Sequence, residues 1–193
     1  MRQLARVYRS HVSSSGEAGE SRPQAMGSVA STARAPHRYT TTCTWSGTTA
    51  VGYDSYSRDH EVTADGADAP LRLSSDRAFR GDPDRWNPEV LLVAAASSCH
   101  MLSFLAAAAR ARIEVISYED RASGEMPDQR EPTGLTSIVL RPIVTVRVPV
   151  DVAEHETVTR RLGHLNEVAH RECFIANSLR TPVVIEPQFR FAE

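Results

Sequence analysis

Lysine is absent from this sequence, and all 22 of its Lys and Arg residues are arginine. The 24 Asp and Glu residues nearly balance them and leave a formal net charge of −2. Without a basic excess, the chain lacks the electrostatic footprint of a nucleic-acid-binding protein. No physical requirement known to us excludes lysine everywhere, so we ascribe its absence to the codon usage of a GC-rich genome.

Cysteine is scarce as well, with three widely spaced residues, Cys43, Cys99 and Cys173. An odd number at such spacing does not make the disulfide framework of a small secreted protein. In a reducing compartment these thiols serve as core residues, metal ligands or redox catalysts. The sequence also lacks a run of roughly 20 apolar residues, which a membrane span requires. We therefore expect a chain without a membrane span.

A polar segment rich in Ser, Arg, Gly and Ala runs from residue 1 to about residue 36. It has no apolar periodicity and no apolar core of a signal peptide. We expect residues 1–36 to be a disordered or poorly ordered extension, within which Met26 is an alternative start. The 193 residues of the chain allow one domain with a substantial core, which we place at 37–193.

The pattern of elements in this domain predicts an α+β fold with mostly antiparallel pairing. Stretches rich in β-branched and aromatic residues, bounded by turn signals, predict strands over 38–46, 51–63, 71–73, 113–120, 136–150 and 183–191. Pro142 interrupts the fifth of these and indicates an edge or a bulge. A second long helix starts at Asp151 and buries Val158, Leu162 and Leu165. A break and a short third helix follow within residues 170–178.

The most informative stretch is residues 87–105, NPEVLLVAAASSCHMLSFL. Asn87 stands at the N-cap position of a predicted helix, Pro88 at its first position and Glu89 in its first turn. From Val90 onward the helix is apolar nearly all round, and one small sheet cannot cover such a surface. This helix predicts burial in the centre of a domain or in an interface, and hence an intimate homodimer.

Two motifs in combination carry a family resemblance: NPEVLLVAAASSCH, and AHRECFIANSL later in the chain. From about His37 to the C terminus the sequence resembles the OsmC/Ohr family of thiol-dependent organic hydroperoxide reductases. The resemblance implies an OsmC-like fold, with antiparallel sheets and two long central helices in an intertwined homodimer. The loop before the helix is more similar to the OsmC-like branch. Phe174 stands where Ohr-type proteins usually have proline, which bears on substrate preference rather than on fold.

The resemblance implies a cytoplasmic enzyme of oxidative or osmotic stress defence that reduces organic hydroperoxides to alcohols without a metal or cofactor. Cys99 would be the peroxidatic thiol, and Cys173 the resolving thiol that forms a disulfide with it. An external dithiol, of lipoyl type, would then reduce that disulfide. The residues alone allow these roles to be exchanged, because Cys173 lies at a predicted helix start, where a thiol pKa can be lowered.

The predicted environment of Cys99 does not by itself stabilise a thiolate. Burial among apolar residues raises a thiol pKa, and Cys99 lies about 15 Å beyond the start of its helix, outside the reach of the helix dipole. A cation is therefore needed, and the resemblance implies an Arg–Glu pair in which Glu89 matches the family glutamate. Because about 15 Å of helix separates Glu89 from Cys99, a second, antiparallel copy must supply the glutamate. Arg58 is the arginine that we favour, and Arg80 is the alternative.

Two other functions use the same residues. Cys99, His100, His170 and Cys173 make a candidate Cys₂His₂ zinc site, although adjacent helix positions point about 100° apart and disfavour chelation by the first two. Otherwise we expect both histidines to be polar residues of the core or interface. A non-catalytic small-molecule-binding protein on the same fold would leave the cysteines idle. Cys43, in a predicted strand, is interpreted as a small core residue.

Overall fold

The structure, a computed structural model, describes residues 35–128, 131–147 and 152–192. The chain divides into two units, Met1–Arg38 and Tyr39–Glu193. Nearly all of the expected extension, residues 1–36, lies outside the described residues. Every helix and strand named below belongs to the second unit.

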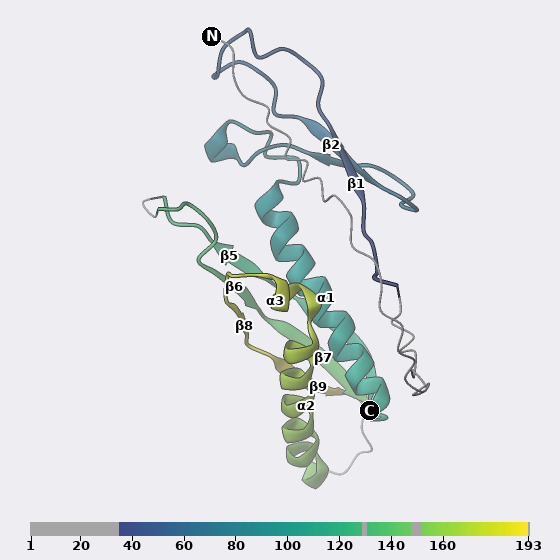
Figure 1. Cartoon of the computed structure of the whole chain (residues 1–193). Coiled ribbons are helices and arrows are strands. Elements are labelled where there is room, and N and C mark those ends of the chain that lie inside the picture. Colours follow the sequence, from purple (N-terminus) through teal and green to yellow (C-terminus); the bar gives the residue numbers. More distant parts are fainter. Residues whose placement is uncertain (1–34, 129–130, 148–151, 193) are drawn as a thin grey trace, which may run out of the picture. The chain divides into compact units, whose positions relative to one another are not determined.

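Three strands come before the first long helix, as the sequence pattern predicts, and β5 (Ser123–Glu125) is a strand that the sequence did not predict (Figure 1). In chain order the elements are β1 (Thr41–Thr44), β2 (His60–Ala64), β3 (Leu71–Leu73), the 3₁₀ turn η1 (Arg77–Phe79), α1 (Pro88–Arg110), β4 (Glu114–Asp120), β5 (Ser123–Glu125), β6 (Ser137–Leu140), β7 (Pro142–Arg147), α2 (Val152–Glu172), α3 (Phe174–Ser178), β8 (Val183–Ile185) and β9 (Gln188–Ala192). The predicted α+β class is confirmed.

The strands form three sheets, with orders β1–β2–β3, β4–β7–β9 and β5–β6–β8. Pairing is antiparallel in β1–β2, β2–β3, β4–β7 and β5–β6. It is parallel in β6–β8 and β7–β9. The two parallel pairs exist because the segment after α3 returns alongside β6 and then alongside β7. The prediction of mostly antiparallel sheets is confirmed.

The chain changes sheet at two places where the sequence predicted one continuous strand. The predicted strand of residues 136–150 is divided at Arg141 into β6 and β7, and the strand of 183–191 is divided into β8 and β9. Pro142 is thus the first residue of a new strand, where a missing N–H is tolerated, and not an edge or bulge. Arg141 and Glu186 form an ion pair of 3.0 Å, so the two breaks lie side by side.

The predicted strand of residues 51–63 is wrong for its first half, since β2 begins only at His60. Gly52 adopts a φ of 90°, which favours glycine, and its N–H closes a turn. Arg58 donates hydrogen bonds of 2.5 Å to the carbonyl oxygens of Tyr53 and Tyr56. Its guanidinium also lies 3.9 Å from the centre of the Tyr56 ring. These local contacts compete with strand pairing.

Helix α1 begins as predicted, because the Asn87 side chain accepts the N–H of Val90 at 2.8 Å. It ends later than predicted, at Arg110, since the four alanines after Leu105 are strong helix formers. With 23 residues α1 is long and apolar enough to cross a membrane by length and composition, so the prediction that its apolar run is too short for a span is wrong. In this fold the buried residues of α1 pack instead on α2 and the strands.

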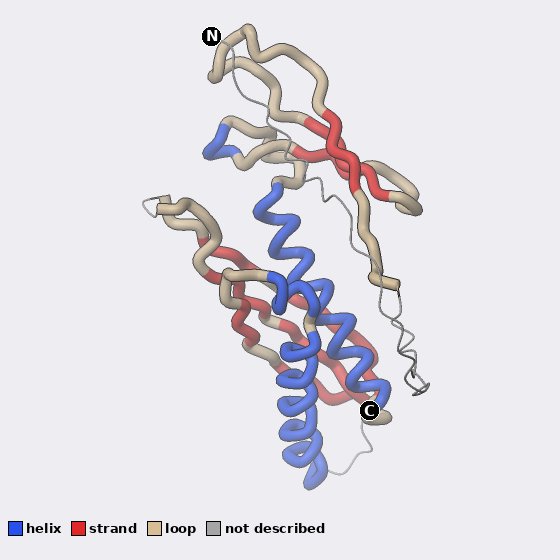
Figure 2. The backbone as a smooth tube through the Cα atoms, viewed as in Figure 1, coloured by secondary structure: helices blue, strands red, loops and turns tan. Residues whose placement is uncertain are grey.

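Figure 2 shows the two long helices lying along the strands that follow α1. Two apolar clusters hold these helices against the strands. The first joins α1, α2, β7 and, at its margin, β4 and β9; its buried members are Phe104, Ala108, Val144, Val146, Leu162 and Ala169. The second joins the first half of α1 to β6 through Ala96, Ile138 and Leu140, with α3 and β8 packed around it. Because both clusters include α1, this helix fixes the position of everything that follows it in the chain.

Phe104 is the largest side chain of the first cluster and is 1% exposed. We expect Phe104→Ala to lower the free energy of unfolding by about 3–5 kcal/mol, from lost transfer energy and the cavity left behind. Denaturant unfolding at a fixed protein concentration measures this change. The control is Tyr39→Ala, at a side chain 91% exposed, for which a change within about 0.5 kcal/mol is expected. Equal effects of the two substitutions would contradict the described core.

Candidate functional site

The structure brings Cys99, from the middle of α1, next to Cys173, at the junction of α2 and α3. Cys173 is the N-cap residue of α3, and its sulfur accepts the N–H of Ala176 at 3.5 Å. The Cys99 sulfur accepts the N–H of Ile175, also at 3.5 Å. The two thiols, which are not linked, are close enough for a side-chain hydrogen bond. Residues far apart in the sequence thus form one dithiol site.

The start of α3 explains part of this arrangement. The first N–H groups of any helix lack partners within the helix, and here the two cysteine sulfurs accept two of them. A hydrogen bond donated to sulfur favours the thiolate over the thiol. Cys99 is remote from the start of its own helix, as the sequence indicates, but the start of another helix reaches it. Sequence reasoning missed this backbone donor, the N–H of Ile175.

The two thiols differ in exposure. Cys173 is 1% exposed, whereas Cys99 is partly exposed. Burial raises the pKa of the Cys173 thiol; the N–H of Ala176 acts in the opposite direction, and the neighbouring Cys99 raises it further. Cys173 is therefore a protonated thiol at neutral pH, and Cys99 is the member of the pair that a solute can reach.

Polar side chains lie buried behind the thiol pair. His100 is 1% exposed, and its Nε2 lies 3.0 Å from Oδ1 of Asn166 in α2. Burial lowers the pKa of His100, so its imidazole is neutral. Burial, and then the charges of Asp120 and Cys173, raise the pKa of Tyr118, whose hydroxyl stays protonated. The prediction that His100 makes a hydrogen bond in the core is confirmed. Asn166 was missed, although a polar residue beside the apolar stripe of α2 was a signal for it.

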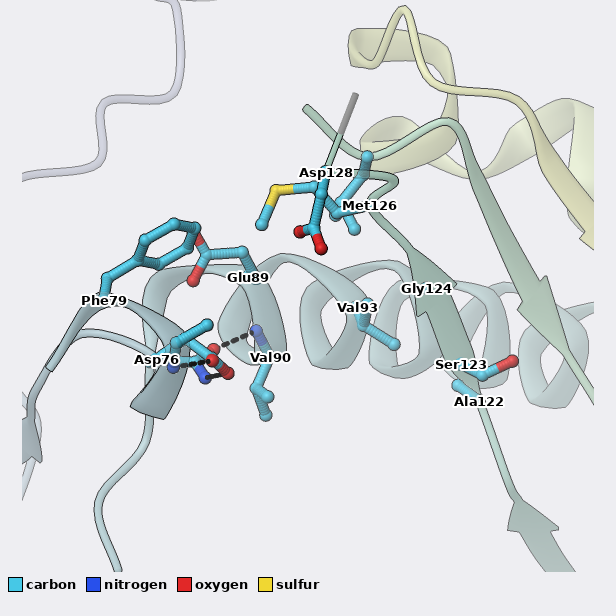
Figure 3. Close-up of a pocket in the computed structure, with 13 residues that line it drawn as sticks. Asp76, Phe79, Glu89, Val90, Val93, Ala122, Ser123, Gly124, Met126 and Asp128 are labelled. Carbon is cyan, nitrogen blue, oxygen red and sulfur yellow. Dashed lines mark hydrogen bonds between the residues drawn. The ribbon is translucent and has the colours of Figure 1, made fainter. Parts of the chain in front are cut away.

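Glu89 does not approach Cys99 within its own chain, since Cys99 lies ten positions further along α1. It borders a pocket of about 520 Å³ at the start of α1 (Figure 3). Figure 3 also shows Phe79 and Met126 beside the Glu89 carboxylate. Within the described part of the chain, Oε2 of Glu89 is buried and has no hydrogen-bond partner. A buried carboxylate oxygen without a partner is unfavourable, so this position suits an added cation.

Both candidate arginines lie in the segment before α1 and are held by that segment. Arg58 bonds to backbone oxygens of its own loop. Arg80 pairs with Asp54 at 2.8 Å and lies 4.9 Å from the centre of the Tyr53 ring. No contact between either arginine and the thiol pair occurs among the described residues.

Two further expectations concern Cys43 and metal binding. Cys43 is exposed, and therefore the interpretation as a core residue is wrong. It is paired with Val62 in the β1–β2 ladder and borders a pocket together with Trp45 and Arg58. Across residues 35–128, 131–147 and 152–192, no group of three or more His, Cys, Asp or Glu side chains is placed to hold a metal ion. The zinc hypothesis therefore finds no ligand set there.

Comparison with known proteins places this geometry in context. The family described as OsmC-like protein has a sequence model that matches residues 81–188. An OsmC-like protein of unknown function from Vibrio cholerae is 33% identical over 79% of this chain and 99% of its own, with a TM-score of 0.69. Among proteins with curated descriptions, none matches.

Two more distant structures share the fold. An organic hydroperoxide resistance protein from Elizabethkingia anophelis is 19% identical, with a TM-score of 0.57, over 82% of this chain and 99% of its own. The organic hydroperoxide resistance protein OsmC from Legionella pneumophila is 16% identical, with a TM-score of 0.54, over 81% of this chain and 99% of its own. At these identities the likeness concerns the fold alone.

Proposed function

This chain belongs to the OsmC-like protein family, and on that premise we propose that it is a thiol peroxidase that reduces organic hydroperoxides to alcohols. The observation that carries the proposal is the pairing of a partly exposed Cys99 with a buried Cys173. The sulfur of each cysteine accepts a backbone N–H of α3. A peroxidatic thiol must be reached by substrate, and a resolving thiol must lie beside it. Cys99 meets the first requirement, and Cys173 meets the second.

The reaction has two chemical steps. The Cys99 thiolate attacks one oxygen of ROOH, the O–O bond breaks, and the leaving alkoxide takes a proton to give ROH and a Cys99 sulfenic acid. The Cys173 sulfur then attacks the Cys99 sulfur, the S–O bond breaks, and water and a Cys99–Cys173 disulfide result. An external dithiol, for which we propose a lipoyl-type donor, returns both thiols by exchange. No metal or cofactor takes part in this scheme.

We propose that the working unit is a homodimer with shared sites. Only 22% of the most apolar stretch of α1 is buried within the chain, and Leu102, one turn beyond Cys99, is 61% exposed. A second copy covers this surface in the proposed dimer, with its α1 antiparallel to the first. Glu89 and Arg58 of one copy then act at Cys99 of the other. Oε2 of Glu89 has no partner among the residues that the structure describes, and this supports the pairing, because a guanidinium would satisfy it.

If the exposed apolar face of α1 forms the dimer interface, a charged side chain introduced there should prevent association. Sedimentation of the wild-type protein at micromolar concentration should give a dimer, and Leu102→Glu should give a monomer, because the new carboxylate would be buried without a partner. Val184→Glu, at a β8 side chain 47% exposed, is the matched control and should leave the dimer intact. A wild-type monomer, or a dimeric Leu102→Glu variant, would exclude the proposed interface.

Thiol titration before and after cumene hydroperoxide tests the proposed activity. The reduced chain has three free thiols. In a peroxidase the thiols of Cys99 and Cys173 disappear, because they form the disulfide, and the thiol of Cys43 remains. A non-catalytic binding protein keeps all three, and a zinc protein releases metal. Retention of Cys99 and Cys173 in the presence of peroxide would therefore overturn the proposal.

Substrate preference follows from the apolar surface beside the thiol pair. Phe174 is largely exposed there, and burying each CH₂ of a substrate contributes about 0.8 kcal/mol. We expect kcat/KM for cumene or tert-butyl hydroperoxide to exceed that for H₂O₂ by at least about tenfold, at 1.4 kcal/mol per decade. Steady-state kinetics with a dithiol reductant measures the ratio. Equal values would contradict the apolar contact while leaving the cysteine chemistry in place.

For cellular location we propose the cytoplasm and a role in oxidative or osmotic stress defence. The proposed catalytic cycle starts from two reduced thiols, which that compartment maintains. Family membership and relatives named for organic hydroperoxide resistance support the stress role. Fractionation of cells that express the protein, with blotting against it, tests the location.

A further inference from the structure

The two long helices that lead to the thiol pair pack on each other along one buried stripe each. The buried residues of α1 are Ala96, His100, Phe104, Ala107 and Ala108. On α2 the buried stripe runs through Leu162, Asn166 and Ala169, and Cys173 continues it at the same helical spacing. Among the described residues of both helices, the buried polar side chains are His100 and Asn166. Each apolar stripe thus includes one polar residue.

These two polar residues bind each other. Nε2 of His100 lies 3.0 Å from Oδ1 of Asn166, and the two residues are 1% and 8% exposed. An amide oxygen only accepts hydrogen bonds, so Nε2 of the imidazole is the donor. Burial lowers the pKa of His100, which keeps the imidazole neutral. A single bond between two neutral groups therefore joins α1 to α2 inside an otherwise apolar contact.

A bond of this kind fixes how two helices are aligned along their axes. Apolar contacts are not directional, whereas a hydrogen bond requires a donor–acceptor distance of about 2.7–3.2 Å. A slide by one residue moves a helix by about 1.5 Å. Such a slide would leave both polar groups buried without a partner, which is unfavourable. In coiled coils a single buried polar residue sets the alignment of paired helices in the same way.

The alignment of α1 and α2 also decides where the two sulfurs meet. Cys99 directly precedes His100 on α1, and Cys173 lies on the same stripe as Asn166. A disulfide requires Cβ atoms about 3.5–4.5 Å apart, and a misplacement of about 1 Å can slow a reaction a hundredfold. A slide by one residue is therefore enough to disable the pair. It would also displace the Cys99 sulfur from the N–H of Ile175.

We propose that His100 and Asn166 are positioning residues of the resolving step. Their hydrogen bond holds α1 and α2 in the alignment that places the Cys173 sulfur against the Cys99 sulfur. They act through the two cysteines and take no part in making or breaking bonds. The sulfenic acid rests on the proposed function, but the alignment governs every disulfide that these two thiols form.

A peroxide-free assay measures the approach of the two sulfurs. In a Cys43→Ser background, dithiobis(nitrobenzoate) reacts with the partly exposed Cys99 and releases one coloured thionitrobenzoate. Attack by Cys173 on this mixed disulfide then releases a second. Asn166→Leu, which removes the acceptor of the His100 N–H, should slow the second release by at least about tenfold and lower the melting temperature. The first release, which reports on Cys99 alone, should stay within about twofold of the parent.

A double variant, His100→Leu with Asn166→Leu, separates positioning from stability. Removing both polar partners leaves an apolar contact and should restore the melting temperature that the single variant loses. The second release should nevertheless remain at least about tenfold slower than in the parent. Leu162→Ala, at a fully buried side chain of the same stripe, is the matched control. It should lower the melting temperature and keep the second release within about twofold of the parent.

Three results would overturn this inference. The first is a second release as fast in the double variant as in the parent. Another is equal slowing in Leu162→Ala, which would assign the effect to loose packing. The third is equal slowing of both releases, which would indicate altered reactivity of Cys99.

A separate peroxide arm distinguishes the inference from the proposed function. It treats the Cys173→Ser protein with cumene hydroperoxide and probes Cys99 for sulfenic acid. If both release rates behave as expected but no sulfenic acid forms, the peroxidase proposal fails and the positioning role of His100 and Asn166 stands.

Discussion

Replacement of Cys99 by serine is expected to lower kcat/KM for cumene hydroperoxide by at least about a thousandfold, as loss of a catalytic nucleophile generally does. A serine hydroxyl is not ionised at neutral pH, and no N–H donor can make it as nucleophilic as a thiolate. Cys173→Ser should behave differently. It should consume one equivalent of peroxide per Cys99 and then stop, because the sulfenic acid has no resolving partner. Steady-state and single-turnover kinetics separate the two outcomes.

Cys43→Ser is the matched control for both variants. Its thiol is exposed, lies in β1 and is not a member of the Cys99–Cys173 pair, so turnover within about twofold of the wild type is expected. The reverse pattern, in which Cys99→Ser keeps a first turnover and Cys173→Ser loses it, would exchange the two roles. The sequence alone leaves that exchange open, and the exposure of Cys99 argues against it.

Removal of Arg58, the arginine that we propose to activate Cys99, is expected to give the second-largest loss. An opposite charge within about 4–6 Å lowers a thiol pKa by about 1–3 units, so Arg58→Ala should slow sulfenic acid formation by about ten- to thousandfold at neutral pH. Because a higher pH restores the thiolate without a cation, the deficit should shrink as the pH rises. Single-turnover kinetics in a Cys173→Ser background measures this step alone.

Arg80→Ala is the matched control, since its ion pair with Asp54 is exposed and contributes at most about 1 kcal/mol. The Arg58 side chain also donates hydrogen bonds to backbone oxygens of its own loop, so its removal can destabilise that loop. For this reason Arg58→Lys, which keeps the charge, and melting temperatures of all variants accompany the measurement. A normal rate in Arg58→Ala together with a slow rate in Arg80→Ala would assign the activating role to Arg80.

The fold could be predicted where local signals and burial agree. Asn87 and Pro88 defined the start of α1, and the apolar stripe through Leu162 defined α2. Prediction failed where one β-rich run serves two sheets, because β-branched residues suit both sheets equally and the change of sheet at Arg141 depends on partners elsewhere in the chain. It failed also before β2, where the bonds of Arg58 to its own loop replace strand pairing.

At the site, residue types were predictable and their partners were not. The family resemblance of two motifs pointed to Cys99 and Cys173, and the fold places them together. No sequence pattern could show that the backbone N–H of Ile175 reaches the Cys99 sulfur, because every residue except proline carries such a donor. Asn166 was visible only as a polar residue near an apolar stripe, and its bond to His100 depends on how α1 and α2 are aligned.

Mass spectrometry of the oxidised protein is the most direct test of the central claim, that Cys99 and Cys173 act together as a peroxide-reducing dithiol. After one equivalent of cumene hydroperoxide, digestion of the wild type without reductant should give a disulfide-linked pair of peptides containing Cys99 and Cys173. The Cys173→Ser protein should carry a trappable sulfenic acid on Cys99 instead. Unmodified Cys99 in both proteins, with the peroxide unconsumed, would contradict the claim.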